Sequence, residues 1–184
     1  AVLVAEHTGI YGDRLLKHCT DSHIDIAYVG GHVIHTYKSS PDRGKTDEQD
    51  CAVLREFGER FADKLTFKKF PQAEIYGLRQ LARHRSMLVE DRKRYVTADK
   101  GEDCRPCRET FVKESMKRIV AMLDEEIAAT ERQMQHLISS RKELEKNYDI
   151  ITSVKGVGLV TAVEILVTTD NFTTITTARQ YAAY

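Results

Sequence analysis

A seven-residue repeat over residues 112–148 constrains the fold of this chain more than any other feature of its sequence. Counting in sevens from Met116 and from Val120 gives ten core positions, and eight of them are apolar. Thr130 and Arg141 fill the other two positions, and the stretch contains neither Gly nor Pro. The repeat predicts a coiled coil of about four and a half heptads, formed within the chain or between chains. We therefore expect a homo-oligomer that assembles through this segment.

Composition narrows the class of protein. The chain has 184 residues, of which 41% are hydrophobic and 30% charged, as in soluble globular or partly coiled-coil proteins. The net charge is zero, so any binding of nucleic acid must come from local patches. No apolar run approaches the roughly 18 residues of a membrane span, and no signal-peptide pattern appears. These features predict no membrane partner and a cytoplasmic location.

Four cysteines are present, and only Cys104 and Cys107 form a closely spaced pair. A zinc site would need two more ligands, which His84 or a second chain would have to supply. We favour reduced, structural cysteines, with a metal site and a redox role as the alternatives.

The first thirty residues have the pattern of a strand, a helix and a second strand. Ala1–Ala5 is an apolar run typical of a buried parallel strand, and Ile24–Val29 is the next strand. Such units place their sites at the carboxyl ends of strands, and Glu6 lies at one of these ends. Glu6 is therefore a candidate functional carboxylate, and capping of the following helix is the alternative.

Asp47 and Asp50 are three residues apart in a segment that is predicted to begin a helix after a polar loop. This spacing puts both carboxylates on one face, in the first helical turn, with Lys45 just upstream. Hard oxygen ligands in a basic setting suit Mg²⁺ (or Mn²⁺) held against a phosphate. The alternative is a surface helix that starts with acidic residues.

A basic segment follows, with eight Lys or Arg and three acidic residues between Lys68 and Arg94, a local net charge of +5. Arg79, Arg83 and Arg85 belong to a helix predicted from Pro71 to about Tyr95. A cationic helix of this kind would suit the phosphate backbone of DNA or RNA. Solvated surface charge is the alternative interpretation.

Near the C-terminal end, a Gly-x-Gly turn joins two apolar helical segments. Lys155, Gly156 and Gly158 form this turn, which has the helix-hairpin-helix pattern. In that motif, backbone N–H groups receive a DNA phosphate, and Gly allows the phosphate to approach closely. The alternative is a packed helical hairpin with a glycine cap.

Three motifs, in this order, resemble the DEDD transposases of bacterial insertion sequences. They are Glu-His-Thr-Gly-Ile-Tyr at 6–11, Lys-Thr-Asp-x-x-Asp at 45–50 and Gly-Val-Gly-Leu-Val-Thr-Ala at 156–162. The resemblance implies an α/β plus α fold in three parts. Residues 1–66 would be a partial RuvC-like (RNase H-fold) domain, 67–149 the basic helix and coiled coil, and 150–184 the start of a C-terminal transposase domain.

The resemblance also implies a function and a site. Glu6, Asp47 and Asp50 would be the second, third and fourth acids of the DEDD tetrad, binding a divalent metal that acts on DNA strands during transposition. A bridge RNA would direct the recombinase, and a serine would be the nucleophile. We expect the first Asp upstream of Ala1 and the serine beyond Tyr184, so the chain would be an internal fragment, inactive alone.

Two other functions remain open at this point. A RuvC-like repair nuclease would use the same acids, and a coiled-coil adaptor would bind nucleic acid through the basic helix and the hairpin without catalysis. Convergence of the carboxylates of Glu6, Asp47 and Asp50 would separate the enzymes from the adaptor.

Overall fold

The computed structural model of the chain describes residues 2–6, 8–37, 47–102, 104–107 and 109–183. The chain divides into two compact units, Ala1–Phe70 and Pro71–Tyr184, and each is described by itself.

The first unit is built on a small mixed sheet whose strands lie in the order β1-β2-β3. Strand β1 (Val2–Glu6) runs parallel to β2 (Asp25–Val29), in a register that sets Glu6 opposite Val29. Strand β3 (Phe67–Lys68) pairs with β2 in the antiparallel direction. The predicted strand-helix-strand unit is therefore confirmed, and among the described residues β1 is an edge strand with a neighbour on one side only.

Helices connect and cover these strands. A short 3₁₀ turn, η1 (Gly9–Gly12), leads into α1 (Asp13–Asp21), which returns the chain to β2. Helix α2 (Gly31–Tyr37) begins directly after β2. Helix α3 (Asp47–Arg60) packs on β1 and is followed by a second 3₁₀ turn, η2 (Ala62–Lys64).

A small apolar cluster holds α2 and α3 to the sheet. Its buried members are Val29 of β2, Ile34 of α2 and Val53 of α3, and Val4 and Phe57 pack beside them. Helix α3 approaches β1 closely, because a Cβ atom added at Gly58 would lie 2.7 Å from Cγ2 of Val4. The glycine therefore sets the distance between helix and strand.

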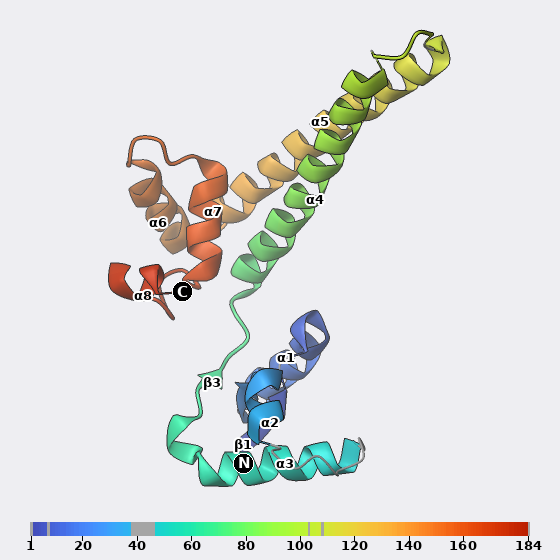
Figure 1. Cartoon of the computed structure of the whole chain (residues 1–184). Coiled ribbons are helices and arrows are strands. Elements are labelled where there is room, and N and C mark those ends of the chain that lie inside the picture. The colour runs from blue at the N-terminus through green and yellow to red at the C-terminus, as the bar shows by residue number, and fades with distance from the viewer. Residues whose placement is uncertain (1, 7, 38–46, 103, 108, 184) are drawn as a thin grey trace. The chain divides into compact units, whose positions relative to one another are not determined.

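The second unit is helical. Helix α4 (Ala73–Glu102) and helix α5 (Thr110–Ser139) run antiparallel along each other as a long hairpin. Helices α6 (Lys142–Thr152) and α7 (Leu159–Thr168) pack against the end of this hairpin where α4 begins, as Figure 1 shows. Helix α8 (Ala178–Ala182) begins with a capping box between Thr177 and Gln180.

One continuous apolar core joins the four longer helices of this unit. Its buried residues are Ile75 and Leu78 of α4, Met134 and Ile138 of α5, Leu144 and Ile151 of α6, and Ala162, Val163 and Leu166 of α7. Helices α4 and α5 approach each other closely at this end, since a Cβ atom added at Gly77 would lie 3.0 Å from Cδ1 of Leu137.

The heptad pattern correctly predicts a helix over α5 and is wrong about where that helix ends, whereas the coiled coil stays a prediction. Leu123, Thr130 and Met134 are buried as predicted, and the Thr130 hydroxyl donates to the carbonyl oxygen of Glu126, 2.8 Å away. The helix stops at Ser139 and does not continue to 148. Arg141, predicted at a core position, has an extended backbone and an exposed side chain.

Tertiary contacts explain this break. The Arg141 guanidinium donates to the side-chain oxygen of Gln72 and, at 3.1 Å, to Oε2 of Glu74, both at the start of α4. These charge-assisted bonds stabilise a bend that the repeat itself could not reveal.

Three further details differ from expectation. Helix α2 and strand β3 were not predicted, and β1 is only partly buried, with Val2 56% exposed. The coarse prediction of an α/β part followed by a helical part is confirmed. Among the described residues, no helix combines the length and apolar character that crossing a membrane requires.

Candidate functional site

Glu6 is the last residue of β1, at the carboxyl end of the parallel strand pair, and its side chain is exposed. The carboxylate lies against the start of α2, because a Cβ atom added at Gly31 would lie 2.5 Å from Oε1 of Glu6. A side chain at position 31 would occupy the space that this carboxylate uses. Gly31 therefore gives the acid its place at the end of the strand.

Helix α3 packs on the strand that ends in Glu6. Gly58 lies against Val4 on β1, and Val53 is buried in a cluster with Val29, the residue opposite Glu6. Asp50 is half-buried and precedes Val53 by three residues, a rise of about 4.5 Å along the helix.

The third predicted acid is only partly described. Asp47 begins α3, but its side chain lies outside the described residues, as do all atoms of Lys45. Among the described side chains, no three of the His, Cys, Asp and Glu type gather closely enough to hold a metal ion. The convergence of Glu6, Asp47 and Asp50 stays a prediction.

The predicted basic helix is real, but its arginines do not share one face. Arg79 and Arg83 are four residues apart on α4 and so lie on the same side of the helix. Arg85 lies on another side, where its Nε donates to Oε1 of Glu131 on α5 at 2.7 Å. The charge of Arg85 is therefore balanced within the helical hairpin.

The Gly-x-Gly turn lies between α6 and α7. Gly156 has a φ of +93°, a conformation that L side chains rarely adopt, and Gly158 is the residue before the first turn of α7. A Cβ atom added at either glycine would meet no atom within 4 Å, and Lys155 beside them is exposed. The backbone of the turn is thus open to an incoming group.

Sequence reasoning missed the residue that fixes the turn after Glu6. The Tyr28 hydroxyl on β2 donates to the carbonyl oxygen of Gly12, 2.9 Å away. Burial, together with the negative potential of Cys19 and Asp13, raises the pKa of this tyrosine above its usual 10.0. No local sequence pattern predicts this hydrogen bond, because Tyr28 and Gly12 lie on different elements. For Gly31, the Gly30–Gly31 pair was the available sequence signal of a special backbone position.

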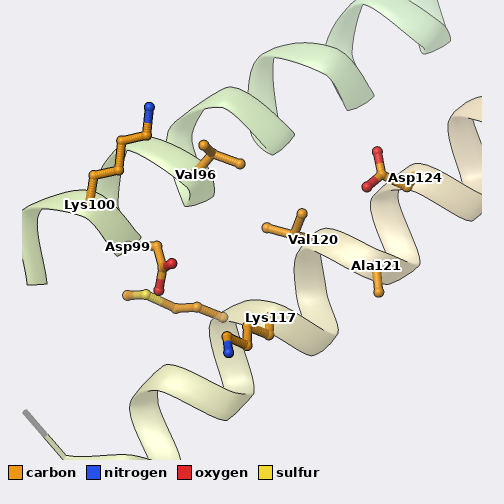
Figure 2. Close-up of a pocket in the computed structure, with 8 residues that line it drawn as sticks. Val96, Asp99, Lys100, Lys117, Val120, Ala121 and Asp124 are labelled. Atoms are coloured by element: carbon orange, nitrogen blue, oxygen red, sulfur yellow. The ribbon is translucent and has the colours of Figure 1, made fainter. Parts of the chain in front are cut away.

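At the other end of the α4–α5 hairpin, where α4 ends and α5 begins, the described residues form no comparable group of candidate site residues. Its seam opens into a cavity of about 290 Å³, with Val96 of α4 and Val120 of α5 on opposite sides in Figure 2. At its rim, Asp124 accepts a hydrogen bond from Nε of Arg92 at 2.5 Å, which raises the pKa of the guanidinium. Cys104 and Cys107, beyond the end of α4, are exposed free thiols.

Comparison with known proteins places the chain in a family. A family model described as a transposase of the DEDD type, named for IS110 elements, matches residues 1–98, more than half of the chain. Two curated relatives are each called a pilin gene-inverting protein, one from Moraxella bovis and one from Moraxella lacunata. Each is 24% identical over 185 residues, which cover 99% of this chain and 54% of the relative. The chain spans about half the length of these relatives, and it belongs to the DEDD transposase family.

Proposed function

We propose that this chain carries part of the metal-dependent nuclease centre of a DNA transposase or recombinase, with Glu6, Asp47 and Asp50 as its acids. The observation that supports this most directly is the packing of α3 on the sheet: Gly58 lies against Val4 on β1, and Val53 shares a buried cluster with Val29, the residue opposite Glu6. Glu6 and the pair Asp47 and Asp50, distant from it in sequence, would then lie at one end of the sheet, where α/β folds place their sites.

The acids suit a hard divalent ion such as Mg²⁺ or Mn²⁺. Carboxylate oxygens are the ligands that these ions prefer, and Gly31 leaves room for the Glu6 carboxylate beside α2. When bound, the ion would stabilise negative charge on the phosphate oxygens during strand cleavage and joining. Glu6, Asp47 and Asp50 would hold the ion, and the family pattern places the first acid and the serine outside this sequence, so we expect this chain alone to be inactive.

Contacts to the nucleic acid would come from both units. On α4, Arg79 and Arg83 share a face that could follow a phosphate backbone, while the ion pair with Glu131 reduces the charge that Arg85 can offer. Lys45, two residues before Asp47 in the sequence, would add a further cation. The open turn at Lys155, Gly156 and Gly158 would receive a phosphate through backbone N–H groups, as in helix-hairpin-helix motifs.

The proposed domains are those that the resemblance to the transposase family implies. We assign residues 1–66 to a partial RNase H-like domain, 67–149 to the basic helix and coiled coil, and 150–184 to the start of a helix-hairpin-helix domain. Parallel pairing of β1 with β2 supports the first assignment, and the α6-turn-α7 arrangement supports the last.

The nature of the partners completes the proposal. DNA is the substrate, and a guide RNA would use the same phosphate-binding side chains. A homo-oligomer would have to use side chains that face away from the α4–α5 seam, because these two helices pack against each other within the chain. A sedimentation coefficient that stays at the value of the monomer at every protein concentration would contradict the proposed homo-oligomer.

Metal-directed backbone cleavage tests the site in this chain. Fe²⁺ that replaces Mg²⁺ at a bound site reduces added hydrogen peroxide to hydroxide and a hydroxyl radical, which cuts the nearby peptide backbone. We expect cuts near residue 6 and near residues 47–50, suppressed by excess Mg²⁺ and lost in the Asp47→Asn/Asp50→Asn variant. Glu59→Gln, at an exposed acid on the same helix, is the matched control and should leave the cuts unchanged. Cleavage at only one of the two segments would refute the shared site.

Activity itself has to be measured in a longer protein that contains this sequence. Asp47→Asn with Asp50→Asn should abolish Mg²⁺-dependent strand transfer and leave DNA binding largely intact. Unchanged transfer would remove the acids from the mechanism and leave a nucleic-acid-binding scaffold.

A further inference from the structure

The turn that follows Glu6 displays two large apolar side chains to solvent. In η1, Ile10 is 60% exposed and Tyr11 is 85% exposed. We propose that Tyr11, with Ile10 beside it, is a platform on which a base of the DNA strand stacks close to the phosphate held by the acids. This inference rests on the proposed function and names a base-contacting residue for it.

The backbone beneath the platform is fixed. Gly9 opens the turn with a φ of +62°, and Gly12 closes it, buried against β2. The Tyr28 hydroxyl donates to the Gly12 carbonyl oxygen at 2.9 Å, and a Cβ atom added at Gly12 would lie 3.0 Å from that hydroxyl. The turn is therefore anchored on its inner side while Ile10 and Tyr11 face outward.

Exposure of a single tyrosine is common on protein surfaces and would carry no argument alone. Tyr11 is distinguished by its position close to Glu6 in the sequence. Five residues separate it from Glu6, a separation of at most about 18 Å even for an extended chain. A nucleotide a few positions away from a phosphate bound at Glu6 would therefore be within reach of this ring.

Tyrosine also has the right chemistry for a base. Its flat ring stacks on any nucleobase, and stacking of this kind is worth about 1–3 kcal/mol per base. It has two side-chain torsions, so little conformational entropy is lost on binding. Ile10 widens the apolar surface without adding a hydrogen-bonding group, which predicts contact without sequence preference.

The absence of tryptophan from the sequence allows a direct test. Tyr11→Trp gives a chain with a single indole on the platform, and Phe111→Trp gives a matched control at a 68% exposed position on α5. Each is titrated with a short single-stranded oligothymidylate and with an abasic strand of equal length. Fluorescence anisotropy of a label on the strand reports binding, and indole emission reports stacking.

We expect oligothymidylate to quench the indole at position 11 and the abasic strand to leave it bright, with no change at position 111. Tyr11→Ala should weaken binding of oligothymidylate about 5- to 150-fold, as loss of one stacked base implies, and leave binding of the abasic strand unchanged. Tyr11→Phe should retain the affinity.

Contrary outcomes are distinct. Binding without base-dependent quenching, or an equal loss of affinity for both strands in Tyr11→Ala, would overturn the platform and leave the proposed function standing. Failure of the unaltered chain to bind either strand would count against the proposed function itself, and the platform would fall with it.

Discussion

The two units of this chain differ in how their interiors are built. The helical unit has one apolar core that runs through α4, α5, α6 and α7. The sheet unit has a small apolar cluster between α2, α3 and β2, a few further buried residues at Cys19, Ile26 and Ala27, and a strand β1 that is only partly buried. The proposed chemistry belongs to the thinner unit. Carboxylates gathered around an ion repel one another in its absence, so a scaffold that carries them is expected to be the less stable of the two.

Removal of a central side chain from the helical unit should have the largest effect. Leu166→Ala empties a fully buried position in α7, which lies against α4, α5 and α6. We expect a loss of about 3 kcal/mol in the free energy of unfolding, from lost burial and the cavity left behind. Urea unfolding followed by helical circular dichroism measures it. Met122→Ala, at an exposed position on α5, should change stability by less than about 0.5 kcal/mol.

Overpacking the sheet unit should have a smaller effect. Gly58→Ala forces a methyl group to within 2.7 Å of Val4 on β1, so α3 must move away from the sheet. We expect a net loss of about 1–2 kcal/mol, because a clash of this kind outweighs the helix propensity gained from Ala. Faster hydrogen exchange of the β1 amides would measure this loss of stability within the sheet unit.

A second glycine and a double variant make this result specific. Gly101→Ala, where the added methyl group meets nothing within 4 Å, should be neutral or stabilising. Val4→Ala combined with Gly58→Ala should recover part of the loss. Simple additivity of the two changes would contradict the steric account.

The anchor of the turn after Glu6 makes the sheet unit sensitive to alkaline pH. Because the pKa of Tyr28 is higher in the folded state than its usual 10.0, its contribution is fully present below about pH 10 and is lost as the pH rises through the folded pKa. Tyr28→Phe should flatten this alkaline loss of stability. At neutral pH the variant should lose about 1 kcal/mol with the hydrogen bond to Gly12. If the free energy of unfolding of Tyr28→Phe fell with rising pH as steeply as that of the unaltered chain, other groups would be the cause of the alkaline loss of stability.

Ion pairs along the helical hairpin should matter least. Arg85→Ala breaks a partly shielded pair with Glu131, for which we expect about 0.5–1 kcal/mol. Arg92→Ala breaks a more exposed pair with Asp124 and should shift the melting temperature less. Both shifts should shrink in high salt. A larger shift for Arg92→Ala would mean that the seam near the hairpin end depends on charge more than on packing.

Sequence patterns predicted what local periodicity determines. The parallel strand pair and the long helix through Leu123 and Met134 follow from apolar spacing, and both are present. The helix end at Ser139 could not be predicted, because Arg141 finds its partners in α4, some seventy residues away in sequence. Strand β3 has only two residues and exists through pairing with β2.

In the candidate site, too, local sequence patterns predicted some features, while contacts between distant segments determine the others. Glu6 and Asp50 could be proposed from their places relative to a strand end and a helix start. The roles of Gly31 and Tyr28 depend on contacts between segments: the Gly30–Gly31 pair marks the end of a strand but not the contact of Gly31 with Glu6, and no sequence pattern indicates the hydrogen bond of Tyr28.

The edge position of β1 has a practical consequence for handling this polypeptide. Within the part of the chain that the structure describes, β1 is paired on one side only, and such a strand presents a row of N–H and C=O groups that can template a further strand. Val2 and Leu3 on β1 are partly exposed beside them. Purified material is therefore expected to aggregate through β-strand addition as it is concentrated. A short peptide that caps this edge, or a lysine introduced at Leu3, should keep it dispersed.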